Sequence, residues 1–238
     1  MTWTRLRQIA LVAADLDAVV DRLGTVLGLR VAHRDPAVAA FGLRNAVLPL
    51  GTQFVEVVSP TRPGTAGGRQ LERLGGDGGY MVIGHVGPAP ADHEALRARV
   101  EQLGVRVALA STGDDGYRLL QLHPADTGGS FLELDFQPGG DDPTGPWMPA
   151  GRHWRDAVRT EVVHAITGVE IRVRGAAEVA ARWGAVTGCP VVEGVLTLDN
   201  ATVTFGEGSG GLVAVDCAGG HDDEQVIGGV TFRVRAGG

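Results

Sequence analysis

Hydrophobic and polar positions along the chain repeat in one rhythm. Three segments each combine an apolar run typical of a β-strand, an amphipathic helix and a short strand-like stretch. The first strands are expected at residues 6–13, 80–86 and 168–173, the helices at 17–27, 92–103 and 176–187, and the short stretches at 29–31, 105–107 and 189–191. A glycine follows each helix, at Gly28, Gly104 and Gly188, as expected for a left-handed helix cap.

Alternating, β-rich runs follow each helix, so each segment is predicted to be a βαβββ module. The predicted strands are residues 41–50 and 53–58, then 117–122 and 130–136, then 195–199 and 201–205. Residues 211–216 and 226–234 indicate a fourth, eroded module whose helix is reduced to a loop at 221–225. The sequence therefore predicts four modules.

One helix covers only one face of a four-stranded sheet, so modules are expected to pair. We predict an α+β glyoxalase-like fold, whose repeated modules form curved mixed sheets in two paired-module halves. The halves are residues 1–138, which hold the candidate site, and residues 160–238, a degenerate pair. Residues 139–159 are the linker, with Gly and Pro at the start and two aromatics, Trp147 and Trp154, expected to dock it onto a domain.

Composition narrows the function classes. Charged residues make up 21% of the chain and the net charge is −7, which gives no basic footprint for nucleic acid or anionic lipid. No apolar window is long enough for a membrane span, and the N-terminus lacks the apolar core of a signal peptide. The two cysteines fit a reducing compartment. We expect a cytoplasmic protein, a monomer or homodimer, whose partner is a small molecule.

Specific residues resemble one family. QFVEVV at residues 53–58 and SFLELD at 130–135 resemble the last strand of vicinal oxygen chelate modules, in which the central Glu binds a metal. HPADTGGSFLEL at residues 123–134 resembles a segment of methylmalonyl-CoA epimerases, and RQIALVAADL at 7–16 resembles the family's first strand. The resemblance covers residues 5–138 well, whereas residues 160–238 share only the repeating order of predicted strands and helix. It implies a cup-shaped sheet with a central pocket.

The family pattern implies a four-ligand metal site. Transferred to this chain, its positions are Gln8, Glu56, Glu133 and one residue of the second module's first strand. The difference in residue number between matching positions of the two modules places that fourth position at His85. If the second module has an insertion after this strand, the fourth position falls near Met81 instead. A buried carboxylate needs a metal, a cation or water, so the alternative for each Glu is a solvent-facing position.

Two function classes follow. The first is a lyase or isomerase that depends on one divalent metal (Zn, Ni, Co, Mn or Fe), which polarises a substrate carbonyl while Glu133 or Glu56 moves a proton on the adjacent carbon. The second is a metal-free protein that binds or sequesters a small molecule and resembles bleomycin-resistance proteins. An iron dioxygenase is disfavoured because two His ligands and a carboxylate are not visible.

Other residues are candidate substrate contacts. Residues 61–69, with Arg69, and the following Arg73 are predicted to be either a mobile lid that meets an anionic group or a plain flexible connector. Met81 and His123 are expected at the pocket, with a turn position as the alternative for His123. The second half offers no ligand set, and Glu170 there is expected to be solvated.

Overall fold

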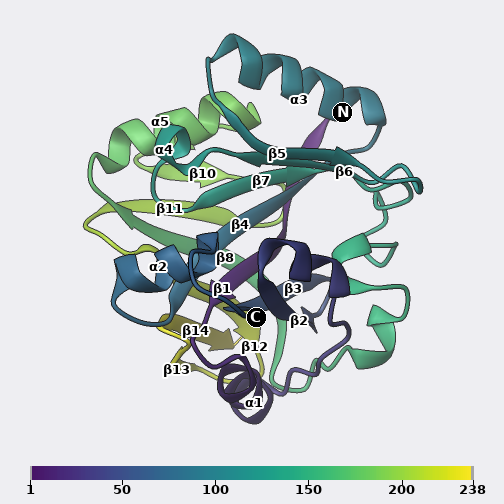
Figure 1. The fold of residues 1–238 in the computed structure, drawn as a ribbon, viewed down its shortest axis with the longest axis vertical. Coiled ribbons are helices and arrows are strands. Elements are labelled where there is room, and N and C mark those ends of the chain that lie inside the picture. Colours follow the sequence, from purple (N-terminus) through teal and green to yellow (C-terminus); the bar gives the residue numbers. More distant parts are fainter. Residues whose placement is uncertain (1, 237–238) are drawn as a thin grey trace.

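The computed structural model describes residues 2–236 and contains two seven-stranded sheets (Figure 1). The first half contains β1 (Trp3–Val12), α1 (Leu16–Leu27), η1 (Pro36–Phe41), β2 (Leu43–Leu50), β3 (Gln53–Pro60), α2 (Ala66–Leu74), β4 (Gly78–Gly87), α3 (Pro90–Gln102), β5 (Val107–Thr112), β6 (Arg118–Leu122), α4 (Pro124–Thr127) and β7 (Phe131–Asp135). The linker carries the 3-10 turns η2 (Met148–Ala150) and η3 (Trp154–Ala157). The second half contains β8 (Val163–Val173), α5 (Ala176–Thr187), β9 (Val191–Val192), β10 (Val195–Thr197), β11 (Thr202–Glu207), β12 (Gly211–Gly219), β13 (Asp223–Ile227) and β14 (Val230–Ala236).

Both sheets follow one topological plan. The first has the order β2-β3-β1-β4-β7-β6-β5 and the second β13-β14-β12-β8-β11-β10-β9. In each sheet the first strands of two modules pair antiparallel at the centre, and each of them pairs in parallel with the last strand of its own module. The α+β fold of paired modules predicted from the repeat is therefore shown.

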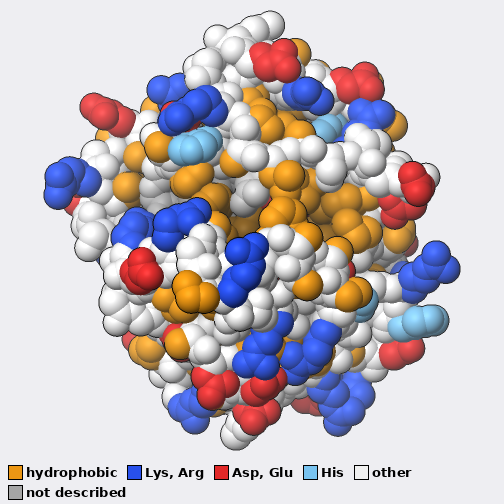
Figure 2. Space-filling view, in the orientation of Figure 1, with side chains coloured by type: hydrophobic (Ala, Val, Ile, Leu, Met, Phe, Trp, Pro, Cys, Tyr) orange, Lys and Arg blue, Asp and Glu red, His pale blue; other side chains and the backbone are white. Residues whose placement is uncertain are grey.

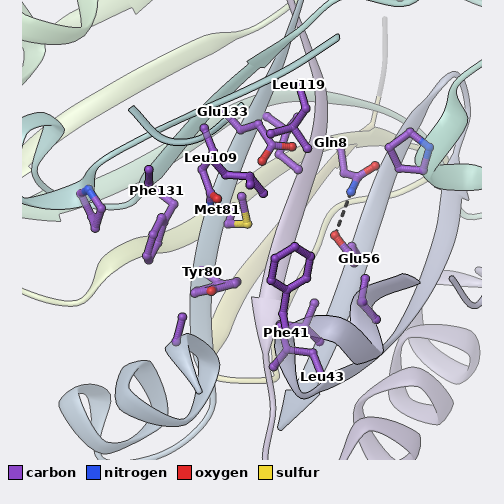
Figure 3. Close-up of a pocket in the computed structure, with 18 of the residues that line it drawn as sticks. Gln8, Phe41, Leu43, Glu56, Tyr80, Met81, Leu109, Leu119, Phe131 and Glu133 are labelled. Atoms are coloured by element: carbon purple, nitrogen blue, oxygen red, sulfur yellow. Dashed lines mark hydrogen bonds between the residues drawn. The ribbon is translucent and has the colours of Figure 1, made fainter. Parts of the chain in front are cut away.

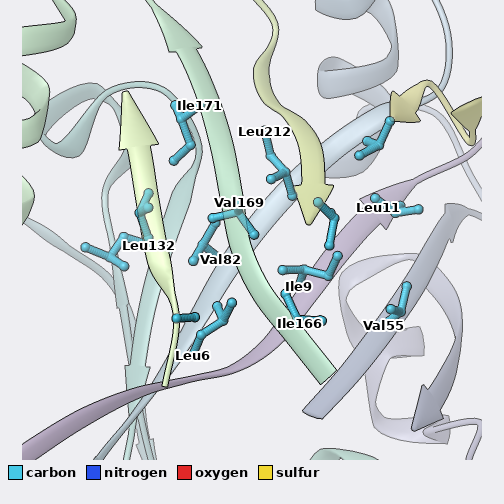
Figure 4. Packing of buried hydrophobic residues seen from close by; sticks show 14 of the residues in the cluster. Leu6, Ile9, Leu11, Val55, Val82, Leu132, Ile166, Val169, Ile171 and Leu212 are labelled. Atoms are coloured by element: carbon cyan, nitrogen blue, oxygen red, sulfur yellow. The ribbon is translucent and has the colours of Figure 1, made fainter. Parts of the chain in front are cut away.

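The two sheets pack face to face through one hydrophobic core. Leu6, Ile9 and Leu11 of β1 and Val82 of β4 meet β8 and β12 of the second sheet (Figure 4). A buried polar bridge also crosses this interface, because Gln53 accepts a hydrogen bond from the Ile166 amide and donates one to its carbonyl. The other face of each sheet points outward.

Helices cover the borders of this sandwich. Helix α1 packs against β2 and β3 and also contacts β13 of the fourth module, which has no helix of its own. Asp15 caps the start of α1 and Gly28 ends it with φ 72°, as the sequence predicts. One helix thus serves two modules.

Three local expectations were wrong. The segment predicted to be a lid or flexible connector, residues 61–69, is irregular only up to Thr65, which caps the regular helix α2 that Gly75 ends. The expected loop of the fourth module is strand β13, because Gly228 and Gly229 turn the chain within a run that looked like one strand. The stretch after α1 forms only an isolated bridge, between His33 and Val47, where a strand was expected.

Candidate functional site

A cavity of about 950 Å³ opens on the outer face of the first sheet. Its walls come from all seven strands of this sheet, β1 to β7, with α2 and η1 at the rim (Figure 3). Most of the lining is apolar, and its larger members are Phe41, Leu43, Tyr80, Met81, Ile83, Leu109, Leu119 and Phe131. Gln8, Glu56 and Glu133 point into the same space (Figure 3). The two repeated carboxyl groups therefore share one cavity.

Gln8 is held from both ends of its amide. The indole Nε1 of Trp147 donates a 2.8 Å hydrogen bond to Gln8 Oε1. An indole N–H can only donate, so the amide oxygen must face Trp147 and the NH2 group must face the other way. Gln8 Nε2 accordingly donates to Glu56 Oε2 over 2.9 Å.

Glu56 is enclosed by two side-chain amides. Besides the bond from Gln8, Asn45 Nδ2 donates to Glu56 Oε1 over 2.7 Å. Burial raises the pKa of Glu56, and the two hydrogen bonds oppose that rise. Each carboxyl oxygen of Glu56 thus already has a donor.

A second carboxyl group stands beside Glu133. Asp135 lies two residues further along β7, on the same face, and the two side chains are hydrogen-bonded to each other. Tyr117 Oη donates to Asp135 Oδ2, and the Leu120 amide donates to Oδ1. Burial raises the pKa of Asp135 to about 7 and that of Glu133 well above its usual value, so the pair retains a proton at neutral pH.

The strand register identifies the fourth position of the family pattern. In the first module Glu56 lies beside Ala10, and Gln8 is two residues earlier on the same strand. In the second module Glu133 lies beside Ile83, so the residue that matches Gln8 is Met81. Met81 lines the cavity, as expected of a pocket residue.

His85 lies away from the cavity. The linker covers it, and the ring of Trp147 in the linker lies 5.4 Å from the His85 ring between centroids. The ring of Trp3 in β1 lies 4.9 Å from the His85 ring between centroids. The Gln137 amide donates to its Nε2, and burial lowers its pKa to about 3. Placing His85 among the ligands of the cavity was therefore a misjudgement of register.

The remaining predicted contacts reach the cavity. Arg69 on α2 and His123 both line it. His123 also caps the short helix α4, because its Nδ1 accepts from the Ala125 amide. Both interpretations of His123, pocket rim and turn, thus apply to one residue.

The linker closes one end of the cavity region. Trp147 and Trp154 are 1% and 2% exposed, in line with the expected docking. Buried Arg7 lies against both indole rings and Phe54, and it donates to the carbonyls of Thr52 and Pro143. The linker is therefore part of the folded core.

Four residues of the site escaped the sequence reasoning. Asp135 could have been found from its spacing, because a residue two positions after Glu133 shares its face of the strand. Asn45 stands out as a polar residue within an apolar run. The contacts of Tyr117 and Trp147 carry no sequence signal, since they depend on how the loop and the linker fold back.

The donor set does not fit a hard divalent ion. The oxygen of Gln8 faces the indole of Trp147 and its NH2 group faces Glu56, and the matching position of the second module is a thioether, Met81. Within residues 2–236, no group of three or more His, Cys, Asp and Glu side chains is arranged to hold a metal. The first half keeps the pocket of the fold without a ready-made coordination shell.

Comparisons with known proteins identify a family and several similar structures. The sequence model of the glyoxalase-like domain family matches residues 9–187. Streptomyces coelicolor methylmalonyl-CoA epimerase is 28% identical, covering 57% of this chain and 98% of its own, with a TM-score of 0.48. The Mycobacterium tuberculosis epimerase is 24% identical over 61% of this chain and 91% of its own, with a TM-score of 0.47.

A likeness over the whole chain is found as well. A hypothetical protein from Staphylococcus aureus covers 98% of this chain and 99% of its own at 14% identity, with a TM-score of 0.69. No curated protein matches the sequence. None of the helices within residues 2–236 has the length and apolar character that crossing a membrane requires.

Paired βαβββ modules around a concave pocket define a glyoxalase-like protein. The chain belongs to the glyoxalase-like domain family, and through it to the vicinal oxygen chelate superfamily.

Proposed function

We propose that this chain is a metal-independent small-molecule-binding protein that holds an apolar ligand in the cavity of its first sheet. The observation that carries the proposal is the hydrogen bond from Trp147 to Gln8. It turns the Gln8 oxygen toward an indole of the linker, so Gln8 presents its NH2 group, which cannot bind a metal, to Glu56. The Gln8 amide thereby becomes a structural bridge between the linker and Glu56.

The shape and lining of the cavity support a ligand of moderate size. A volume of about 950 Å³ and a mostly apolar lining are typical of pockets for drug-sized molecules. Aromatic and aliphatic side chains from both modules, such as Phe41, Tyr80 and Leu119, line opposite parts of the wall (Figure 3). Burying an apolar ligand against them is the main source of affinity.

The acidic groups of the floor favour a ligand that hydrogen-bonds over a metal cation. The Glu133–Asp135 pair keeps a proton near neutral pH, and Tyr80, whose pKa is raised to about 12 by burial and by both glutamates, keeps its own. These groups can donate and accept hydrogen bonds, which orients a ligand without adding a full pair of charges.

The competing assignment is a metal-dependent lyase or isomerase that uses Glu133 and Glu56 with Gln8 as a ligand. It requires the Gln8 amide to turn over, so that its oxygen rather than its NH2 group faces Glu56. Bleomycin-resistance-like sequestration, in contrast, needs only the cavity as it stands. The chemistry of the donors therefore favours the binding protein.

Binding of N-phenyl-1-naphthylamine, a neutral apolar dye whose fluorescence rises in an apolar site, tests the proposal. We expect saturable binding that is unchanged by a chelator. Leu119→Trp, which puts a larger side chain into the open cavity, should weaken it about tenfold or more. Thr204→Trp, at an exposed position of the second sheet's outer face, is the matched control and should leave binding unchanged.

Two outcomes would overturn the proposal. One is dye binding that a chelator abolishes and a single divalent metal restores. The other is equal binding to the parent chain and the Leu119→Trp variant, which would place the dye elsewhere. Circular dichroism of both variants shows that each is folded before the comparison is made.

A further inference from the structure

A second recess adjoins the main cavity. It has a volume of about 350 Å³ and is lined by Arg73 of α2, Gly129, residues 172–174 at the end of β8, and the turn 208–211 between β11 and β12. Arg73 and Gly129 also line the main cavity. The two spaces therefore share a wall and lie next to each other.

Arginine dominates this recess. Among the described residues that line it, Arg73, Arg172 and Arg174 are charged and none is acidic. Arg73 donates to the neutral amide oxygen of Gln70, so its charge is not cancelled there. Arg172 is paired with Glu170, whereas Arg69 adds a further guanidinium one helical turn before Arg73, at the wall of the main cavity. The junction of the two spaces thus carries net positive charge.

The recess exists only because the two halves of the chain meet. Arg73 comes from the first half, and Arg172 and Arg174 come from the second. At the floor, a Cβ on Gly211 would lie 2.5 Å from the carbonyl oxygen of Gly129, so a side chain at this contact is excluded. Gly211 has a φ of 74°, which also favours glycine. The absence of a side chain at Gly211 therefore lets the second half of the chain approach Gly129 of the first half closely.

The surface view shows the same arrangement. A hollow floored by hydrophobic side chains (orange) opens on this face, and basic side chains (blue) gather along part of its rim (Figure 2). The chain contains no lysine, so every one of these basic groups is a guanidinium. Arginine binds tetrahedral oxyanions through paired N–H groups, and several arginines supply more donors than one carboxylate accepts.

We propose that this recess binds the phosphate group of an amphiphilic ligand whose apolar part lies in the main cavity. This inference rests on the proposed function and specifies its ligand class. The phosphate would contact Arg73 and Arg174, while the apolar portion extends past Gly129 into the space lined by Phe131 and Met81. The second half of the chain thereby contributes to ligand recognition.

Displacement of bound N-phenyl-1-naphthylamine by a matched pair of competitors tests the inference. Decyl phosphate and decanol share an apolar chain and differ in the phosphate. We expect decyl phosphate to displace the dye at about tenfold lower concentration than decanol. The advantage should shrink at high salt, because the arginines are exposed.

Substitutions assign the effect to the recess. The double variant Arg73→Gln/Arg174→Gln should remove the advantage of decyl phosphate over decanol, with both competitors measured on the same variant. Arg30→Gln, an exposed arginine that follows α1, is the matched control and should keep the full advantage. Decanoate as a third competitor separates phosphate recognition from a general preference for anions.

The results separate the two proposals. If the dye does not bind at all, the proposed function fails. If the dye binds but the phosphate gives no advantage, or if the double variant keeps that advantage, the recess is not the phosphate site. Equal advantages for decanoate and decyl phosphate would replace phosphate recognition with general anion attraction and would also overturn the inference.

Discussion

The outer faces of the two sheets differ although the strands beneath them follow one plan. The outer face of the first sheet is lined by apolar and hydrogen-bonded groups and bounded by α2, η1 and the linker. On the second sheet Glu170 pairs with Arg172 and Arg233, and Arg233 also reaches Asp216. A shared topology therefore yields a pocket only where other segments cover the concave side.

The burial of corresponding strands shows the same contrast. Four of the five residues of β7 are buried, whereas β14, the last strand of the matching module, alternates between buried and more exposed positions. The acidic residue also stands on a different strand of the parallel pair. In the first sheet it is Glu56 on the last strand β3, beside Ala10, whereas in the second sheet it is Glu170 on the first strand β8, beside Thr204. On the second sheet the buried carboxylate is paired with two arginines, whereas on the first sheet the carboxyl groups are met by neutral amide and hydroxyl donors.

Removing Trp147, which anchors the linker beside the first sheet, should have the largest effect on stability. Trp147→Ala deletes a buried aromatic ring and the donor to Gln8, and we expect the free energy of unfolding to fall by about 3–5 kcal/mol. Urea denaturation measures the loss. Met148→Ala, at a half-exposed neighbour in the linker, is the control and should change stability little. Equal small effects of both variants would show that the linker is not part of the core.

The free energy of unfolding should depend on pH in opposite ways at the two faces. Because burial raises the pKa of Asp135 from 3.8 to about 7, the stabilising proton is fully bound below pH 4 and is lost as the pH rises through 7. The free energy of unfolding should therefore fall by roughly 2–4 kcal/mol between pH 5 and pH 8. Glu133 contributes to the same decline, because burial and Asp135 raise its pKa well above the usual value, so Glu133→Gln, which removes this ionisable group, should make the decline less steep.

Denaturation at several pH values provides the measurement. A decline of the same steepness in the parent chain and in Glu133→Gln would contradict the shared proton of the pair. The comparison is made relative to each protein's stability at pH 5, so that any packing cost of the substitution cancels.

The second sheet should respond in the opposite direction and more weakly. Hydrogen bonds from Arg233 and Arg172 lower the pKa of Glu170 despite partial burial, so its stabilisation is present above its unfolded pKa and lost as the pH falls. Glu170→Gln should cost about 1 kcal/mol at pH 7 and less at pH 3. Dye binding should stay unchanged in this variant, and its loss would show that the two outer faces are coupled rather than independent.

The repeat predicted the fold because the physical signals were local. Amphipathic spacing and helix-ending glycines placed α5 at its observed bounds, and the strand periodicity placed Glu56 and Glu133 on one concave face. Local signals did not predict Glu170 correctly, because it was expected in solvent and is buried against two arginines. Its partner Arg233 lies 63 residues away, and nothing in the local pattern links the two.

The site was less predictable for a related reason. Counting residues between modules suggested His85, but β4 continues further past the matching position than β1 does past Gln8, and the pairing of Glu133 with Ile83 puts that position at Met81. The helix α2 was missed because its first turn contains Gly67 and Gly68, which favour loops. Contacts made by the folded-back linker depend on tertiary packing that periodicity does not encode.

Metal content tests the metal independence of the cavity most directly. The chain is purified without a metal-binding tag, dialysed against Zn, Ni, Co, Mn or Fe ions in turn, and analysed by elemental mass spectrometry after removal of free ions. We expect far less than one ion per chain in every case, with dye binding unchanged. One retained ion per chain that disappears in Glu133→Gln would contradict metal independence and restore the metal-dependent alternative.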